Sequence, residues 1–184
     1  MSKILVDTID TRSGTSTLTL GSSNAGTIAL GSGDVQSNFL YPAFMAQMSA
    51  DQSISSNTDT KVDFDTEIFD TDGAYDHSTN QRFTVPSGKA GKYFITCTLG
   101  TDDGNEGSSF VINIRKSGSE IGESSFNRIQ RTSGVLSFGV NSIIDLSEGD
   151  YVEIFARHET AVNLQPGINS GEFKSRFGGY RIGT

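Results

Sequence analysis

The sequence contains a single cysteine, Cys97, no tryptophan and only three prolines among its 184 residues. One cysteine excludes an intrachain disulfide, so packing or neighbouring subunits must hold the fold together. No stretch approaches the roughly 18 apolar residues of a membrane-spanning helix, and the amino terminus lacks the apolar core of a signal peptide. We therefore expect a chain that folds in the cytoplasm and does not insert into a membrane.

Basic residues are scarce as well, with 14 Lys and Arg against 22 Asp and Glu and a formal net charge of -8. Nucleic-acid binding requires a basic surplus to neutralise phosphates, so nucleic acid is not an expected partner. The acidity is local, because eight acidic residues and only one basic residue, Lys61, lie between Asp51 and Asp76. This segment predicts a negative surface.

The residues that are abundant favour strands and turns. The chain has 21 glycines and many serines, threonines and asparagines, and no convincing helical period occurs after residue 38. Short alternating apolar runs joined by glycine-rich turns are typical of β-structure. The composition therefore predicts an all-β protein.

The first part of the chain is a repetitive stem. Thr17-Leu18-Thr19-Leu20-Gly21 recurs ten residues later as Thr27-Ile28-Ala29-Leu30-Gly31, with a turn-rich spacer between the two copies. Burying its few aliphatic side chains contributes on the order of 10 kcal/mol at ~25 cal/mol per Å². Ordering about 30 residues at about 1 to 2 kcal/mol each costs more than that. A disordered linker is one reading of this segment, but its strand alternation favours a stem that orders against copies of itself or a host scaffold.

A head follows the stem, because aromatic residues first cluster after residue 38. We assign residues 1–37 to the stem and 38–184 to the head. In the run 91–99 the alternation places Tyr93, Ile95, Cys97 and Leu99 on one face, and in 110–115 it turns Phe110, Ile112 and Ile114 inward. These side chains are predicted core residues, and Cys97 is predicted to be a buried structural thiol rather than a nucleophile.

Turn-forming residues predict how the strands of the head are connected. We expect a hairpin or loop at Asp102 to Asn105, and a hairpin in which the turn 147–150 joins the runs 135–146 and 151–156. The last segment, 173–182, changes apolar phase across Gly178 and Gly179, which predicts a β-bulge at this glycine pair.

The order of several motifs in the head resembles that of a known fold family. These are Val62-Asp63-Phe64, the segments 69–76 and 83–88, Gly91-Lys92-Tyr93-Phe94, the turn 146–152, and Phe177-Gly178-Gly179-Tyr180-Arg181-Ile182. Together they resemble the jelly-roll heads of the complement-q and tumour-necrosis-factor-like proteins, over most of residues 38–184. The resemblance implies a jelly-roll β-sandwich. Animal members follow a collagen stalk, whereas no Gly-X-Y repeat precedes this head.

The stem resembles a different group of proteins. Its amino terminus, Lys3-Ile4-Leu5-Val6-Asp7-Thr8-Ile9, and the repeat at residues 17–31 are similar to the start of tail-fibre and other virion appendage proteins of bacterial viruses. This resemblance implies a bacteriophage virion protein, a homotrimer whose stem docks on other virion proteins. A trimer is also expected on physical grounds, because the stem has too small a core for one chain and neither a disulfide nor a metal motif replaces it.

The chain offers few groups for catalysis. His77 and His158 are its only histidines and neither lies in a nucleophile or metal motif, so we expect both at the surface. A glycosidase would need two carboxylates about 5 to 10 Å apart across a sugar-binding cleft, and the sequence leaves such a pair open. We expect that the protein is not an enzyme, with a surface polysaccharide hydrolase as the less favoured alternative.

The acidic segment raises the question of a divalent cation, the only cofactor that we consider. Asp70 and Asp72 are the weak candidate ligands, but Ile68 stands where a calcium loop of the EF-hand type requires an oxygen ligand. Asp63, Asp65 and Glu67 alternate with Phe64, as on a solvated strand surface. We expect a hairpin tip at 69–76 and exposed acidic side chains, with cation binding between subunits or loops as the alternative.

The function that follows from these expectations is binding by several weak sites on one trimer. Linking three sites raises the apparent affinity, often by ~10² to 10⁴-fold, without strong individual contacts. We expect the head to bind a host cell-surface glycan or protein through its loops. The alternative is a decoration or stabilising protein that clamps a capsid or tail surface. The candidate receptor-binding residues are Tyr75, Asp76, His77, Asp102, Asp103, Asn105 and Glu106, together with the segment from Glu159 to Asn163.

Overall fold

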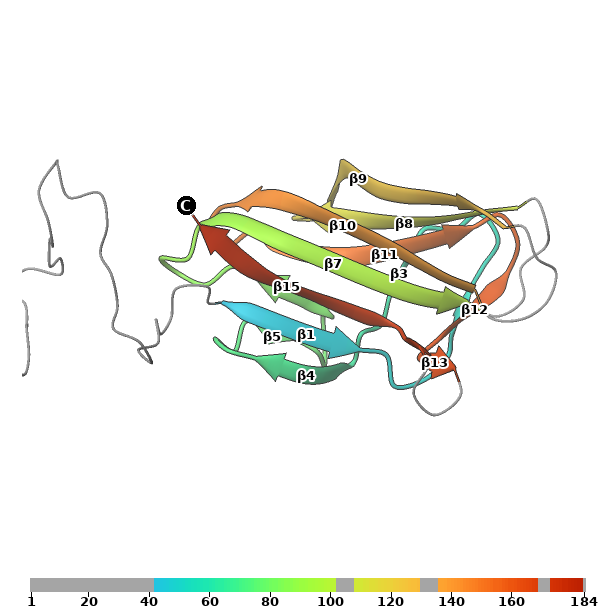
Figure 1. Ribbon diagram of the computed structural model, residues 1–184, viewed down its shortest axis with the longest axis horizontal. Coiled ribbons are helices and arrows are strands. Elements are labelled where there is room, and N and C mark those ends of the chain that lie inside the picture. Colours follow the sequence, from blue (N-terminus) through green and yellow to red (C-terminus); the bar gives the residue numbers. More distant parts are fainter. Residues whose placement is uncertain (1–41, 102–107, 130–135, 169–172, 184) are drawn as a thin grey trace, which may run out of the picture. The chain divides into compact units, whose positions relative to one another are not determined.

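The computed structural model describes residues 42–101, 108–129, 136–168 and 173–183. The stem assigned to residues 1–37 lies outside these described residues. The described part of the head is built from strands packed in two antiparallel sheets (Figure 1). Within it, no helix is long and apolar enough to cross a bilayer. The all-β prediction is therefore confirmed.

The first sheet, sheet A, has the order β4-β1-β15-β7-β10, and β12 and β2 extend it beside the carboxyl end of β7. Its strands are β1 (Ala43–Gln47), β2 (Gln52–Ile54), β4 (Thr66–Asp70), β7 (Gly91–Thr101), β10 (Leu136–Leu146), β12 (Val162–Gln165) and β15 (Arg176–Gly183).

The second sheet, sheet B, has the order β5-β6-β11-β8-β9, and β3 also pairs with β11. Its strands are β3 (Thr60–Lys61), β5 (Tyr75–Asp76), β6 (Arg82–Thr84), β8 (Ser109–Lys116), β9 (Ser119–Arg128) and β11 (Tyr151–His158). A separate short pair joins β13 (Gly167–Ile168) to β14 (Phe173–Lys174).

The core lies between the two sheets and contains the side chains that the alternation predicts. Tyr93, Ile95, Cys97 and Leu99 of β7 are buried, and so are Phe110, Ile112 and Ile114 of β8. These predictions are confirmed. Period-two alternation identifies the inward face of a strand whenever one face of its sheet is covered.

Aromatic rings join the two sheets at the centre of the core. Phe44 of β1 stacks on Tyr75 of β5 at 5.2 Å and on Phe83 of β6 at 4.5 Å between ring centroids. Phe177 of β15 meets Phe44 edge-on at 5.0 Å. Such pairs contribute about 0.5 to 1.5 kcal/mol each beyond their buried area. The aromatic cluster therefore helps to fix the position of one sheet against the other.

The predicted turn at residues 147–150 is present, but the strands that it joins do not form the predicted hairpin. The Asp150 amide donates to the Ser147 carbonyl at 3.1 Å, and Gly149 takes a φ of 81°. However, β10 pairs with β7 in sheet A, whereas β11 pairs with β8, β6 and β3 in sheet B. The turn therefore carries the chain from one sheet to the other.

The expected hairpin tip at residues 69–76 is also wrong, because β4 lies in sheet A and β5 in sheet B. The expected hairpin or loop at Asp102 to Asn105 lies outside the described residues, and the strands on either side of it, β7 and β8, belong to different sheets. A true hairpin joins β8 to β9 through Ser117 and Gly118, whose φ values are 48° and 81°. Two consecutive positive φ angles are typical of a tight hairpin turn.

The predicted β-bulge at the glycine pair is wrong too. From Arg176 to Tyr180 the pairing of β15 with β1 and β7 is regular, and the irregularity lies between Arg181 and Gly183. A Cβ on Gly178 would lie 2.9 Å from the Phe44 carbonyl oxygen, and one on Gly179 would lie 2.7 Å from the Ile95 Cδ1. The glycines are therefore required by the close approach of neighbouring atoms.

Candidate functional site

Tyr75, a predicted receptor-binding residue, belongs to the core instead. Its side chain is buried, its ring packs on Phe44, and its hydroxyl donates to the Phe64 carbonyl oxygen at 3.0 Å. Burial raises the pKa of this phenol well above its usual range. The prediction for Tyr75 is wrong, because β5 forms part of sheet B and turns the ring inward.

Asp76 follows Tyr75 and organises the turn after β5. Its carboxylate accepts hydrogen bonds from the Thr79 amide at 2.9 Å, from the Asn80 side chain at 2.7 Å and from the Ser78 amide at 3.2 Å. The bonds from Thr79, Asn80 and Ser78 lower the pKa of Asp76 to about 2, because they stabilise the charged form. This carboxylate is therefore already occupied by its own turn.

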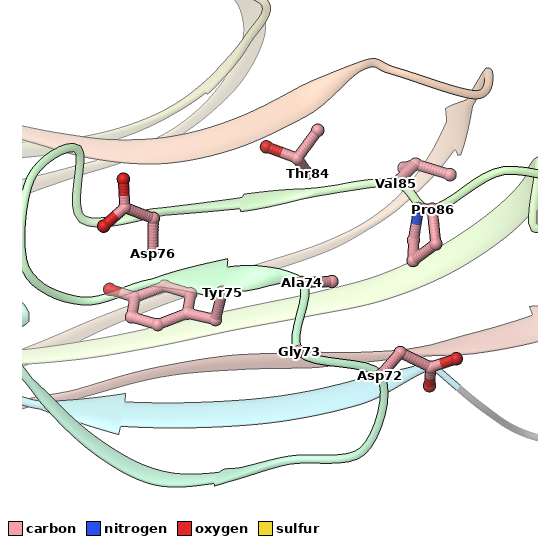
Figure 2. A pocket seen from close by; sticks show the side chains of 8 residues that line it. All are labelled: Asp72, Gly73, Ala74, Tyr75, Asp76, Thr84, Val85 and Pro86. Atoms are coloured by element: carbon pink, nitrogen blue, oxygen red, sulfur yellow. The ribbon is translucent and has the colours of Figure 1, made fainter.

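A shallow hollow of about 470 Å³ opens beside these residues. Figure 2 shows Asp76 and Asp72 at opposite ends of the lining, with Ala74 and Tyr75 between them. Asp72 accepts a hydrogen bond from the Thr71 hydroxyl at 2.7 Å. The remaining lining is formed by Gly73, Thr84, Val85 and Pro86.

The candidate metal ligands take part in the same loop. Asp70 accepts hydrogen bonds from the Tyr75 amide at 2.6 Å and the Asp72 amide at 3.2 Å. Within the described ranges, no three His, Cys, Asp or Glu side chains are grouped as metal ligands. Asp70 therefore shapes the connection between the two sheets, and cation binding by Asp70 and Asp72 stays a prediction.

The other acidic side chains of this segment lie as expected for a solvated surface. Phe64 is buried, whereas Asp63, Asp65 and Glu67 are exposed. Asp65 accepts hydrogen bonds from the amide and hydroxyl of Ser49 at 2.9 and 2.5 Å. Burial and the neighbouring Asp65 raise the pKa of Asp63.

The two histidines differ in their surroundings. His77 is exposed, as predicted, and its Nδ1 lies 3.6 Å from Glu67. The prediction that His158 is a surface residue is wrong, since its ring is fully buried between Ser108, Thr160 and Phe110. Its Nε2 lies 3.2 Å from the Ser108 hydroxyl. As the last residue of β11, His158 continues the inward alternation of Val152, Ile154 and Ala156.

The remaining predicted receptor-binding residues fall into two groups. Asp102, Asp103, Asn105 and Glu106 lie outside the described residues. The segment from Glu159 to Asn163 is tied to the scaffold, because Glu159 accepts hydrogen bonds from the Ser109 hydroxyl and amide at 2.5 and 3.1 Å, and Asn163 accepts one from Ser53 at 2.6 Å. Receptor binding by these loops stays a prediction.

Cys97 is a core residue as predicted. It is 1 % exposed on the inward face of β7, and burial raises the pKa of its thiol above its usual value. A buried thiol with a raised pKa carries little reactive thiolate at neutral pH.

The outer face of sheet A carries a row of apolar side chains, which we call the apolar face. Register places Ile143 of β10 beside Phe94 of β7, and Phe94 beside Tyr180 of β15. The Phe94 and Tyr180 rings lie 5.5 Å apart. Phe69 of β4 lies beside Met45 of β1 in the next row. Ile143 is 60 % exposed, Phe69 43 % and Tyr180 42 %, so these apolar side chains are accessible to solvent in the described part of the chain.

The outer face of sheet B is charged and internally paired, and we call it the charged face. Lys61 binds Glu153 at 2.6 Å, although Glu153 is nearly buried. Arg115 stacks on the Phe155 ring at 3.8 Å and reaches Asp59 at 3.0 Å and Glu120 at 2.9 Å. Opposite charges therefore neutralise each other around Lys61 and Arg115.

Both faces were absent from the sequence predictions, and the signals for them were incomplete. Ile143 and Tyr180 stand out of phase with the inward residues Ile144 and Phe177, so alternation alone could have marked them as outward apolar side chains. That they meet on one sheet depends on the pairing of each with Phe94, which is 49 residues from Ile143 and 86 from Tyr180, and local sequence does not contain such pairing.

No known family model and no curated protein matches this chain. Solved structures do. The globular domain of zebrafish complement 1qA has a TM-score of 0.54 and 15% identity, and murine APRIL at pH 5.0 has a TM-score of 0.55 and 12% identity; each match covers 77% of this chain and 98% of the other. Eiger TNF from S. frugiperda has a TM-score of 0.50 and 13% identity, over 77% of this chain and 90% of that one.

The head is a jelly roll. At sequence identities of 12% to 15%, the similarity establishes the fold but not a shared activity. The predicted complement-q and tumour-necrosis-factor-like architecture is thereby confirmed for the head.

Proposed function

We propose that this chain is a homotrimeric binding protein without catalytic activity, a fibre-like appendage of a bacterial virus. Its jelly-roll head would self-associate through the apolar face and bind a host cell-surface glycan or protein. The apolar face is the observation that carries the self-association. The stem, by its resemblance to virion appendage proteins, supports the viral assignment and attachment to other virion proteins. The site of action would then be the virion, assembled in the host cytoplasm.

Energetics support the use of the apolar face as an interface. Burying apolar area contributes about 25 cal/mol per Å². On sheet A, Ile143 is 60 % exposed and Tyr180 42 %, and the half-buried Phe94 lies between them, so a second surface could bury their remaining apolar area. Contiguous exposed apolar patches on soluble proteins are typical of association surfaces.

Measurement of the mass of the full-length chain in solution tests the self-association. We expect a particle of three times the 19.7 kDa chain mass in sedimentation equilibrium. Ile143→Asp and Tyr180→Asp should each shift the mass towards that of the monomer, because they place a charge on the apolar face. Asn113→Asp, a matched change on the outer face of sheet B, should leave the trimer intact. A monomeric wild-type chain would contradict the proposal.

A second candidate uses the same apolar face differently, since it could equally cover a capsid or tail protein. The protein would then decorate or stabilise the particle. Copy number on purified virions separates the two candidates. A fibre is expected in a few trimers per particle, and a decoration protein in many tens of copies.

A further inference from the structure

Phe126 on β9 is the most exposed of the large apolar side chains in the described part of the chain, at 67 %. It lies beside Val111 of β8, which in turn lies beside Arg157 of β11. Neighbouring strands are about 4.8 Å apart, so Phe126 and Arg157 stand about 10 Å apart across the sheet, with the smaller Val111 between them. This row lies on the outer face of sheet B, away from the apolar face.

Arg128 stands on the same outer face as Phe126, because the two residues are two positions apart on β9 and both are exposed. Within the described residues, neither Arg128 nor Arg157 donates a hydrogen bond. Arg157 approaches Asp59 only at 3.9 Å, which is too long for a hydrogen bond. Two exposed arginines therefore stand on the same face as Phe126, and neither uses its guanidinium group in a hydrogen bond within the described residues.

The nearby acidic groups, Asp59 and Glu159, have closer hydrogen-bond partners than Arg157 and Arg128. Asp59 binds Arg115 at 3.0 Å, and Glu159 accepts hydrogen bonds from Ser109 at 2.5 and 3.1 Å. These bonds from Ser109, followed by the positive charge of Arg128, lower the pKa of Glu159. Arg128 and Arg157 therefore lie near Glu159 and Asp59 but donate no hydrogen bond to them, so their N–H groups can still donate to the carboxylate of a ligand.

We propose that Phe126, Arg128 and Arg157 form a binding site for a sugar ring that carries a carboxylate. The apolar face of the ring packs on Phe126, and its carboxylate accepts paired hydrogen bonds from the guanidinium groups, a geometry that arginine favours. Val111 forms the floor between them. This inference rests on the proposed function, and it narrows the receptor to an acidic polysaccharide on the host surface.

Binding of the full-length protein to polygalacturonate tests the site, with dextran as the neutral sugar and polyglutamate as the anion without a ring. We expect polygalacturonate to bind and to weaken as salt rises, because salt screens exposed charges. Dextran and polyglutamate should bind at least tenfold more weakly. Equal binding of polyglutamate would overturn the sugar assignment, and absence of polygalacturonate binding would overturn the site.

Variants locate the binding. Arg128→Gln and Arg157→Gln should each weaken polygalacturonate binding about tenfold, the loss of one charge-assisted hydrogen-bonding group, and Phe126→Ala about fivefold. Lys174→Gln removes one positive charge from an exposed residue of β14 and should change binding less than twofold. Equal losses in Arg128→Gln and Lys174→Gln would indicate general charge attraction and overturn the proposal.

The solution mass of each variant separates this inference from the proposed function. Phe126→Ala should remain a trimer, and dissociation of this variant would place Phe126 in the subunit interface and overturn the site. A trimeric wild-type protein that does not bind polygalacturonate contradicts only the proposed sugar site. A monomeric wild-type chain contradicts the proposed function, whatever it binds.

Discussion

The outer faces of sheet A and sheet B differ in how their apolar surface is shielded from water. On sheet B, Arg115 lies between Asp59 and Glu120 and covers Phe155, so charged groups shield the apolar surface and pair with one another. On sheet A, Ile143, Phe94 and Tyr180 form a row that no charged side chain of the described residues is shown to cover. Around Arg115, therefore, the charged face pairs its charges within one chain. When a second surface covers a face with adjoining exposed apolar side chains, the free energy of the system falls.

The largest expected effect comes from breaking sheet A beneath its apolar face. A Cβ on Gly179 would meet Ile95 Cδ1 and the Phe94 carbonyl oxygen at 2.7 Å, whereas nothing lies within 4 Å of one on Gly183. Gly179→Ala should therefore reduce the free energy of unfolding by about 3 kcal/mol through overpacking. Gly183→Ala on the same strand should change it by less than about 0.5 kcal/mol. Urea denaturation measures both, and equal effects would refute the close approach.

The next effect concerns the charged face. Glu153→Ala removes the nearly buried partner of Lys61 and should cost about 2 kcal/mol, because the ammonium group loses its partner in a partly buried site. Glu120→Ala removes an exposed partner of Arg115, which keeps Asp59, and should cost about 0.5 kcal/mol or less. Thermal unfolding of the two variants compares a buried pair with an exposed one. Equal losses of stability in the two variants would contradict the idea that burial determines how much an ion pair on the charged face contributes.

The smallest effect is a pH dependence at the edge of sheet B. The folded pKa of Asp76 is about 2, below the value of 3.8 for the free side chain. Its contribution to stability is therefore fully present above about pH 4 and is lost as the pH falls towards 2. Asp76→Asn cannot titrate, so the stability difference between wild type and variant should shrink over this range. A difference that stays constant from pH 5 to pH 2 would contradict the role of the Asp76 carboxylate.

Strand faces were predictable from sequence, whereas strand partners were not. Cys97 and Ile112 alternate with polar neighbours, and both are buried as expected. The turn at Ser147 to Asp150 was also identified correctly, yet its flanking strands entered different sheets. Alternation reports that one face of a strand is covered, but it does not report which sheet the strand joins.

The predicted site residues likewise depended on strand partners that the sequence does not reveal. The sequence predicts a hairpin tip at residues 69–76 and so places Tyr75 in a loop, but the pairing of β5 with β6 turns its ring into the core. His158 lies in no catalytic or metal motif and is predicted at the surface, but its position on β11 buries it beside Ser108. The burial of residues in short strands or at strand ends depends on packing against segments outside their local sequence.

The sequence by itself determined the all-β class of the head, the inward residues of its long strands and the inert character of Cys97, because these depend on period-two alternation and composition. Only the tertiary structure decided that Ile143, Phe94 and Tyr180 meet on one face and that Phe126 and Arg157 share another. These groupings arise from antiparallel pairing between segments far apart in the chain. Pairing of that kind depends on the free energy of the whole core, and no local run of residues contains it.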